Sequence, residues 1–341
     1  MNKYLKTITF VILATLTCLC QAKELSTKDK NEVVKLLIGK IEKEYVLTEN
    51  IEKIKQSLLS LKETDKFTNV SSASQFSKLL DEALKKIDKH FAVQWRDANE
   101  KPKVQAEYEN WFSKLDRKNS GFNKIEILDG NIGYIDFWGF DEVNNRSKKR
   151  AATVMSMVSD SDALIFDLRN NEGGSAAMDQ FISSYLFKEA TQLNSIYSKQ
   201  TGITTDYWTS LNVVGLKITD TPVYILISKK TFSAAEAFAY SLKVLNRATL
   251  IGETTRGGAN PWQFFDLGNG FRAAIPIAKA VNPITKSNWE GVGVKPNIEV
   301  EQEKALSIAY EMALKKVSMV SKNSFQLKEI ENKLIKLKDE K

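Results

Sequence analysis

The chain has 341 residues, of which 43% are hydrophobic and 27% are charged, and its net charge is +7. This length accommodates a large core and predicts two domains, and the composition is that of an ordinary globular protein. The positive excess is spread along the chain. Its one dense patch, NNRSKKR at 144–150, is typical of a solvated surface. The charge therefore predicts no nucleic-acid partner.

The first residues have the pattern of a secretory signal. A basic start, MNKYLK, is followed by the apolar run TITFVILATLTCLC and by the small residue Ala22. We predict a signal peptide over 1–22, a secreted or periplasmic mature protein, and no stable membrane anchor after cleavage. An uncleaved anchor is one alternative, although the apolar run is short for a membrane span. A lipid on Cys18 or Cys20 is the other.

The residue types of the predicted mature chain limit its chemistry. Both cysteines lie within the predicted signal, and the one histidine is His90. Disulfides, thiolate-bound metal and a cysteine nucleophile are thereby excluded, and a single histidine predicts no metal cluster. Neither Gly-Gly pair has the spacing of a P-loop or a dinucleotide fingerprint, so no cofactor is predicted.

The apolar spacing predicts where the domains lie. Apolar residues recur three and four apart up to Lys89, which predicts a helical N-terminal domain over 23–90. Strands and helices then alternate, which predicts an α/β core over 91–302. Two further helices are expected over 303–341. The stripe on the last of them is more typical of packing than of a partner site; it comprises Leu327, Ile330, Leu334 and Leu337.

Within the core, two unbroken apolar runs are typical of buried parallel strands. They are ALIFDL at 163–168 and VYILIS at 223–228. The turn residues DGN and LGNG each lie between apolar alternations and predict two hairpins.

Ser233 lies where VYILIS turns into a predicted helix. With Glu236 it forms a Ser-x-x-Glu capping box, so helix capping is the structural alternative for its hydroxyl. The position also suits a nucleophile, since α/β folds place their sites where strand ends face helix N-termini. Gly173 and Gly174 mark a second such turn, although ordinary turn chemistry explains a lone Gly-Gly pair. An oxyanion needs two backbone donors, and the amides of Gly174 and Ala234 are the candidates.

A serine nucleophile needs a base, and the candidates for assisting it are few. His90 lies in KIDKHFAV, at a predicted helix-to-strand junction, and Glu290 lies in NWEGVGVKPNIEV, a loop marked by glycine and proline. Taken alone, a single histidine is more often structural or exposed, and a loop carboxylate is more often solvated.

Four segments, taken together and in order, resemble the tail-specific (C-terminal-processing) serine protease family over roughly residues 85–300. They are DLRNNEGG, TFSAAEAFAY, NRATLIGETTRGGA and NWEGVGVKPNIEV. Within the family the sequence is most similar to the branch of the tricorn protease core and the interphotoreceptor retinoid-binding protein. The processing branch has a lysine base in a G-K-G that follows G-E-x-T, but here GETTRGGAN places Gly258 at that position. The resemblance therefore excludes the lysine dyad at its usual place.

The tricorn-like branch uses Ser, His and Glu, and the resemblance implies these roles for Ser233, His90 and Glu290. The sequence departs from tricorn at Lys89, where tricorn has a serine beside the histidine. The implied fold is a crotonase/ClpP-like α/β spiral core with the helical N-terminal domain over the cleft.

The resemblance implies acyl transfer to Ser233, with His90 as base, Glu290 orienting the imidazolium, and the amides of Gly174 and Ala234 holding the oxyanion. The expected substrate is an unfolded or C-terminal peptide or protein outside the cytoplasm. A histidine base predicts a rate that rises with pH through about 6–7.5.

Two alternatives stay open. A non-catalytic protein on the same fold would bind an apolar ligand or a peptide, but such a protein has no need to keep Ser233, His90 and Glu290 together. The other alternative is a thioester hydrolase on the same α/β spiral. The serine motif argues against it, but less strongly than the three residues argue against a non-catalytic protein.

Overall fold

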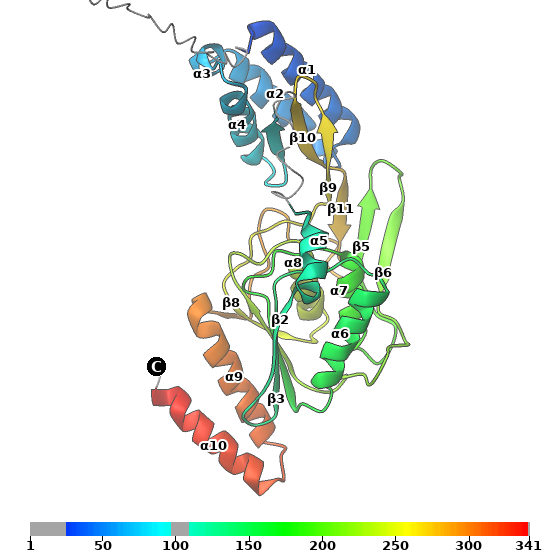
Figure 1. Ribbon diagram of the computed structural model, residues 1–341, viewed down its shortest axis with the longest axis vertical. Coiled ribbons are helices and arrows are strands. Elements are labelled where there is room, and N and C mark those ends of the chain that lie inside the picture. The colour runs from blue at the N-terminus through cyan, green and yellow to red at the C-terminus, as the bar shows by residue number, and fades with distance from the viewer. Residues whose placement is uncertain (1–24, 97–108, 340–341) are drawn as a thin grey trace, which may run out of the picture.

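The computed structural model describes residues 25–96 and 109–339, so the signal peptide predicted at 1–22 lies outside the described residues. The molecule is elongated, with a helical module at one end, an α/β module in the middle and a pair of C-terminal helices at the other end (Figure 1). Within the described ranges, no helix is both long enough and apolar enough to cross a bilayer.

The α/β module is built on a six-stranded sheet. Its strands are β2 (Phe122–Leu128), β3 (Ile132–Phe137), β4 (Ala163–Asp167), β7 (Val223–Ile227), β8 (Thr249–Gly252) and β12 (Ile298–Glu299). Their order is β12-β8-β7-β4-β3-β2, and all pairs are parallel except β2 with β3. Every residue of β4 and β7 is buried, as the unbroken apolar runs predict. The α/β prediction is confirmed.

Helices cover both faces of this sheet. One face carries α6 (Asn145–Met157), α7 (Ala176–Ser183) and α8 (Ala234–Val244), and the other carries α9 (Gln302–Ser318) and α10 (Ser324–Asp339). Successive side chains of β4 point to opposite faces of the sheet. Leu164 and Phe166 pack with the first set of helices, and Ile165 packs with the second. In α10, Ile330 and Leu337 of the predicted apolar stripe are buried.

The N-terminal module combines four helices with a small sheet. The helices are α1 (Thr27–Glu44), α2 (Ile51–Lys62), α3 (Asp65–Asn69) and α4 (Ala73–Lys85), with a 3-10 turn η1 (Thr48–Asn50). The sheet contains β1 (Ala92–Trp95), β10 (Phe271–Pro276) and β9 (Trp262–Asp266), all antiparallel. Residues 262–276 thus pack with the N-terminal helices, whereas the predicted boundaries assign them to the core at 91–302.

Both predicted hairpins are present. The turn DGN joins β2 to β3, and LGNG joins β9 to β10. Gly130 and Gly270 have φ of +81° and +79°, a backbone conformation that glycine adopts without steric cost. His90 lies two residues before β1, which pairs with β10.

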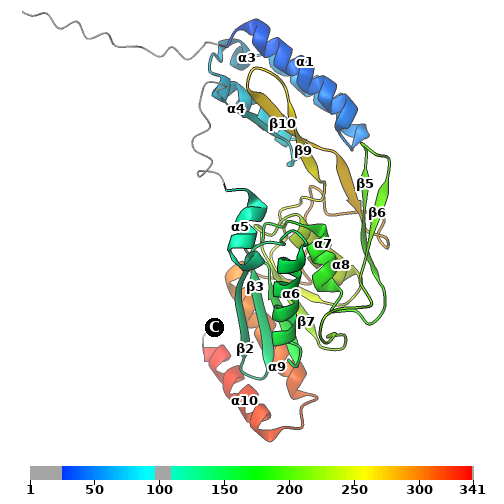
Figure 2. The same cartoon turned by 45° about the vertical axis from the view of Figure 1, so that its right-hand side comes forward.

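A third sheet connects the two modules. It has the order β11-β5-β6 and contains β5 (Gln192–Ser198), β6 (Thr204–Trp208) and β11 (Ala278–Val281). The β5–β6 arm runs from the α/β module to the end of α1 (Figure 2). At its tip, Lys199 Nζ donates to the carbonyls of Glu42 and Tyr45, at 3.1 and 2.8 Å. The described chain is completed by α5 (Trp111–Arg117) and a 3-10 turn η2 (Asn119–Gly121).

Candidate active site

Ser233 occupies a sharp turn between β7 and α8. Its backbone has φ 55° and ψ −121°, a positive-φ conformation that costs a non-glycine residue on the order of 1–3 kcal/mol. Capping serines usually have an extended backbone, whereas Ser233 has a positive φ although its capping box with Glu236 is present. This strained strand-to-helix turn resembles the elbow on which hydrolases present a nucleophile.

Glu236 supplies the other half of the predicted capping box and also binds a second segment. Its Oε2 accepts from the Ser233 N–H at 2.9 Å and from the Gly258 N–H at 2.8 Å. Its Oε1 accepts from Thr255 Oγ1 at 2.5 Å and from the Gly257 N–H at 2.7 Å. Burial raises the pKa of Glu236 to about 7, against the opposing effect of these donors. Glu236 therefore ties the Ser233 turn to the 255–258 loop.

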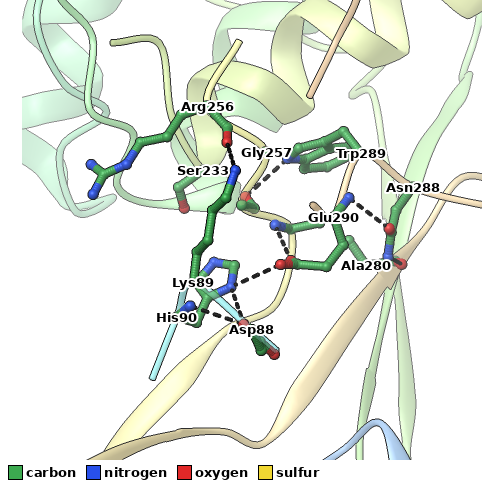
Figure 3. Close-up of polar contacts among 12 residues, drawn as sticks. Asp88, Lys89, His90, Ser233, Arg256, Gly257, Ala280, Asn288, Trp289 and Glu290 are labelled. Carbon is green, nitrogen blue, oxygen red and sulfur yellow. Dashed lines mark hydrogen bonds and ion pairs between the residues drawn. The ribbon is translucent and has the colours of Figure 1, made fainter. Parts of the chain in front are cut away.

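His90 is buried between two carboxylates (Figure 3). Its Nδ1 lies 3.3 Å from Glu290 Oε1 and 3.3 Å from Asp88 Oδ1. Burial lowers the pKa of His90, but hydrogen bonds to Asp88 and Glu290 together with their charges outweigh it and raise that pKa to about 9. Because both carboxylates favour a proton on Nδ1, Nε2 is the ring atom that can exchange a proton with a substrate or nucleophile.

Sequence patterns alone did not identify Asp88. Its Oδ1 accepts from the His90 backbone N–H at 2.9 Å, and its Oδ2 accepts from the Tyr45 hydroxyl at 3.0 Å. The available signal is the Asp-x-His spacing, since an aspartate carboxylate readily accepts the amide two residues further on. That local turn brings the carboxylate to the imidazole as well.

Glu290 is held in place by its neighbours in the loop after β11. Its Oε2 accepts from the Ala259 N–H at 2.7 Å, and its own N–H donates to Asn288 Oδ1 at 3.0 Å. The adjacent Trp289 donates from Nε1 to the Gly258 carbonyl at 2.9 Å. The loop that carries Glu290 is thus attached to the loop that Glu236 attaches to Ser233.

The Gly173–Gly174 turn lies directly against the Ser233 turn. A Cβ on Gly173 would stand 2.7 Å from Ser233 Cβ and 2.8 Å from the Ala234 nitrogen, so only glycine permits this approach. Asn171 Oδ1 fixes the turn by accepting from the Gly173 N–H at 2.9 Å. Within the described part of the chain, the N–H groups of Gly174 and Ala234 have no acceptor, and both residues line the pocket beside Ser233.

His90 and Ser233 both lie close to Gly258, but no hydrogen bond joins them in the part of the chain that the structure describes. A Cβ on Gly258 would lie 2.9 Å from His90 Nε2 and 2.0 Å from the Phe232 ring. The space in which the processing branch would have its lysine is therefore filled by His90 and Phe232. Catalytic hydrogen bonds often become short only when substrate is bound.

Other lysines near the site have partners elsewhere. Lys89 Nζ donates to the Arg256 carbonyl at 3.3 Å, and Lys243 Nζ donates to the Lys295 carbonyl at 2.6 Å. In the described residues both Nζ atoms are thus directed at backbone carbonyls and not at Ser233.

Asp88, His90 and Glu290 each offer one atom of a kind that can ligate a metal, and these atoms lie within 4.8 Å of one another. The two carboxylates thus complete a candidate ligand set that the single histidine alone does not supply. However, both carboxylates approach the same ring nitrogen, Nδ1, which is the arrangement that orients a catalytic imidazole.

A pocket of about 80 Å³ opens beside Ser233. Its walls come from α7, α8, β5, β6 and the loops that carry Gly258 and Trp289. Most lining residues are apolar, and one is an acid, Asp179. The pocket therefore adjoins both the candidate nucleophile and the two unpaired backbone N–H groups.

Residues 131–300 match the sequence profile of Peptidase family S41. The chain belongs to peptidase family S41. The S41 match includes Ser233, Glu290, Gly174 and Ala234, whereas His90 precedes it.

Curated relatives of this S41 chain are processing proteases. It is 28% identical over 186 residues to the carboxyl-terminal-processing protease of Picosynechococcus, which covers 54% of this chain and 43% of the relative. It is 32% identical over 141 residues to that of Synechocystis, covering 41% of this chain and 31% of the relative. It is 30% identical over 167 residues to carboxyl-terminal-processing peptidase 2 of Arabidopsis thaliana, and the match covers 49% of this chain and 31% of the relative. The chain thus spans less than half the length of these relatives.

Solved structures share the fold over most of the S41 chain. Mature CPAF in complex with lactacystin superposes with a TM-score of 0.61 at 13% identity, covering 89% of this chain and 99% of that one. The photosystem II D1 C-terminal processing protease superposes with a TM-score of 0.52 at 16% identity, covering 82% of this chain and 94% of that one.

Proposed function

We propose that this chain is a serine-type peptidase that cleaves peptide bonds through Ser233. The observation that carries the proposal is the convergence of distant segments of the chain around Ser233. The strained Ser233 turn lies against two unpaired N–H groups, and Glu236 and Trp289 connect it to the loop of Glu290, whose carboxylate contacts His90. A capping serine would require none of these features.

In the proposed mechanism, Ser233 Oγ attacks the carbonyl carbon of the substrate while His90 Nε2 takes the hydroxyl proton. The N–H groups of Gly174 and Ala234 donate to the oxyanion. Glu290, together with Asp88, orients the ring and stabilises the imidazolium. His90 then gives the proton to the leaving amine, and water hydrolyses the acyl-enzyme by the same steps.

The proposed substrates are unfolded or C-terminal peptides outside the cytoplasm. The names of the curated relatives support C-terminal processing, and the charge-then-apolar pattern at 1–22 supports secretion or a periplasmic location. Intact mass of the exported protein tests the location. A mature N-terminus at or near Lys23 is expected, and retention of Met1 or a lipid on Cys18 or Cys20 contradicts it.

A carrier of apolar ligands is not favoured by the pocket beside Ser233. Its volume is about 80 Å³, whereas pockets for small-molecule ligands usually measure about 300–1,000 Å³. This pocket is suited to one side chain rather than to an extended apolar molecule.

Hydrolysis of a quenched-fluorescence peptide library tests the proposal. The Ser233→Ala variant should lose turnover while its unfolding midpoint stays close to wild type, and Ser74→Ala, at an exposed serine of α4, should keep full activity. Turnover by folded Ser233→Ala at the wild-type rate would refute the assignment of the nucleophile.

A further inference from the structure

The pocket beside Ser233 contains a buried acid that the mechanism does not use. Asp179 lies on α7 and lines the pocket together with Leu193 and Ile196 of β5, Tyr207 of β6 and Ala237 of α8. Only 4% of Asp179 is exposed. A carboxylate this deeply buried carries a large desolvation cost, so its presence there needs a physical reason.

The partners of Asp179 leave part of its hydrogen-bonding capacity unused. Ser183 Oγ donates to Asp179 Oδ1 at 3.0 Å, and within the described residues it is the one hydrogen-bond donor to this carboxylate. No lysine, arginine or histidine lines the pocket. Burial raises the pKa of Asp179 to about 7, and the hydrogen bond from Ser183 lowers it only in part. Oδ2 can therefore accept a hydrogen bond from a ligand that enters the pocket.

A structural role for Asp179 explains less. An aspartate near a helix start can interact favourably with the helix dipole, but such residues are normally solvated or bonded to backbone N–H groups of the first turn. Here the side chain is buried, and its partner is a hydroxyl one turn further along α7.

The remaining features of the pocket define what it can hold. Its volume of about 80 Å³ is far below the about 300–1,000 Å³ of small-molecule pockets, and it suits a single side chain. Ala234, which also lines the pocket, presents the N–H proposed for the oxyanion, so the entering side chain belongs to the residue whose carbonyl is attacked. That residue is P1, on the acyl side of the scissile bond.

We propose that Asp179 determines specificity at P1, selecting a side chain with an apolar stem and a terminal N–H donor. The stem packs on Leu193 and Ile196, and the donor binds the free oxygen of Asp179. Lysine and glutamine have this chemistry, whereas norleucine has the stem without the donor, and glutamate brings a second carboxylate. This inference rests on the proposed peptidase function and names the substrate side chain that the same site would take.

A site that binds a donor rejects an analogue without it strongly, because the buried acceptor is then left unpaired. We therefore expect kcat/KM for P1 lysine and glutamine to exceed that for P1 norleucine by about 10-fold or more, with glutamate lowest. The lysine-to-norleucine ratio should fall about 10-fold in Asp179→Asn and should invert in Asp179→Leu. Ser183→Ala, which leaves the carboxylate in place, should keep the wild-type preference.

Binding to the inactive Ser233→Ala variant separates this inference from the peptidase proposal. Peptides that end in lysine or norleucine would be compared by calorimetry, with and without Asp179→Asn. Tighter binding of the lysine peptide, lost in Asp179→Asn, supports the inference even if no peptide is hydrolysed. Equal binding of both peptides, or a norleucine preference in the wild-type enzyme, overturns it. If the wild-type enzyme neither hydrolyses peptides nor reacts with a fluorophosphonate at Ser233, the peptidase proposal itself is refuted.

Discussion

Replacing Asp88 by asparagine should shift the pH dependence of catalysis. Asp88 and Glu290 both contact His90 Nδ1, and together they raise the pKa of His90 from its ordinary 6.5 to about 9 despite burial. The wild-type rate should therefore rise with pH well above the range of about 6–7.5 that a free imidazole predicts. Asp88, which sequence patterns did not identify, contributes to this difference together with Glu290.

The expected size of the shift follows from the distance of each contact. Both carboxylates lie 3.3 Å from Nδ1, and an opposite charge this close typically shifts a pKa by about 1–3 units. Asparagine at position 88 keeps an oxygen for the His90 backbone N–H and removes the charge. We expect the pH midpoint of kcat/KM to fall by about 1 unit in Asp88→Asn, and by a similar amount in Glu290→Gln.

The assay is kcat/KM for one peptide between pH 5 and 10, with the rate of fluorophosphonate labelling as a second readout. Tyr45→Phe is the matched control, because it removes a hydrogen bond to Asp88 Oδ2 and leaves the charge. Its midpoint should stay close to wild type. A wild-type midpoint near 6.5, or the same midpoint in Asp88→Asn and wild type, would refute the reasoning.

Four further outcomes are expected. Glu236→Gln, which cannot accept from all four donors, should lower the free energy of unfolding by about 1–3 kcal/mol and reduce kcat, as urea unfolding and peptide assays would show. Gly258→Ala should reduce kcat/KM, because its Cβ meets Phe232 and His90 Nε2; wild-type kinetics would contradict this. Lys243→Met should keep most activity, and a loss as large as that of His90→Ala would restore a lysine base. Because the pKa of His90 is raised on folding, its stabilising effect is complete below pH 6.5 and is lost as the pH rises through about 9; a urea midpoint that does not fall over this range would contradict it.

The sequence predicted the α/β core well because its signals are local. The runs that became β4 and β7 are continuous and apolar, and the turns at Gly130 and Gly270 need glycine. The boundary of the N-terminal module could not be read in the same way. Strand β10 returns to pair with β1 and carries β9 on its other edge, and such pairing between segments far apart in the chain leaves no mark on local periodicity.

The sequence predicted those residues of the candidate site that belong to motifs. It did not predict residues whose role depends only on how the folded chain brings them together. The motifs identified Ser233, His90, Glu290 and the Gly173–Gly174 turn. The capping box of Ser233 and Glu236 is present, but the positive φ of Ser233, 55°, could not be predicted from the Ser-x-x-Glu pattern. Asp88 and Asp179 were not identified because their significance arises from burial and from neighbours brought close by folding, such as Nδ1 of His90 and the walls of the pocket.

Labelling with a fluorophosphonate, followed by peptide mapping, tests the central claim most directly. A serine activated by His90 should react covalently at Ser233, with one adduct per chain, and the labelling should disappear in Ser233→Ala and fall by several orders of magnitude in folded His90→Ala. Absence of an adduct on wild-type protein that is folded and held near pH 9, or an adduct on any other residue, would contradict the account.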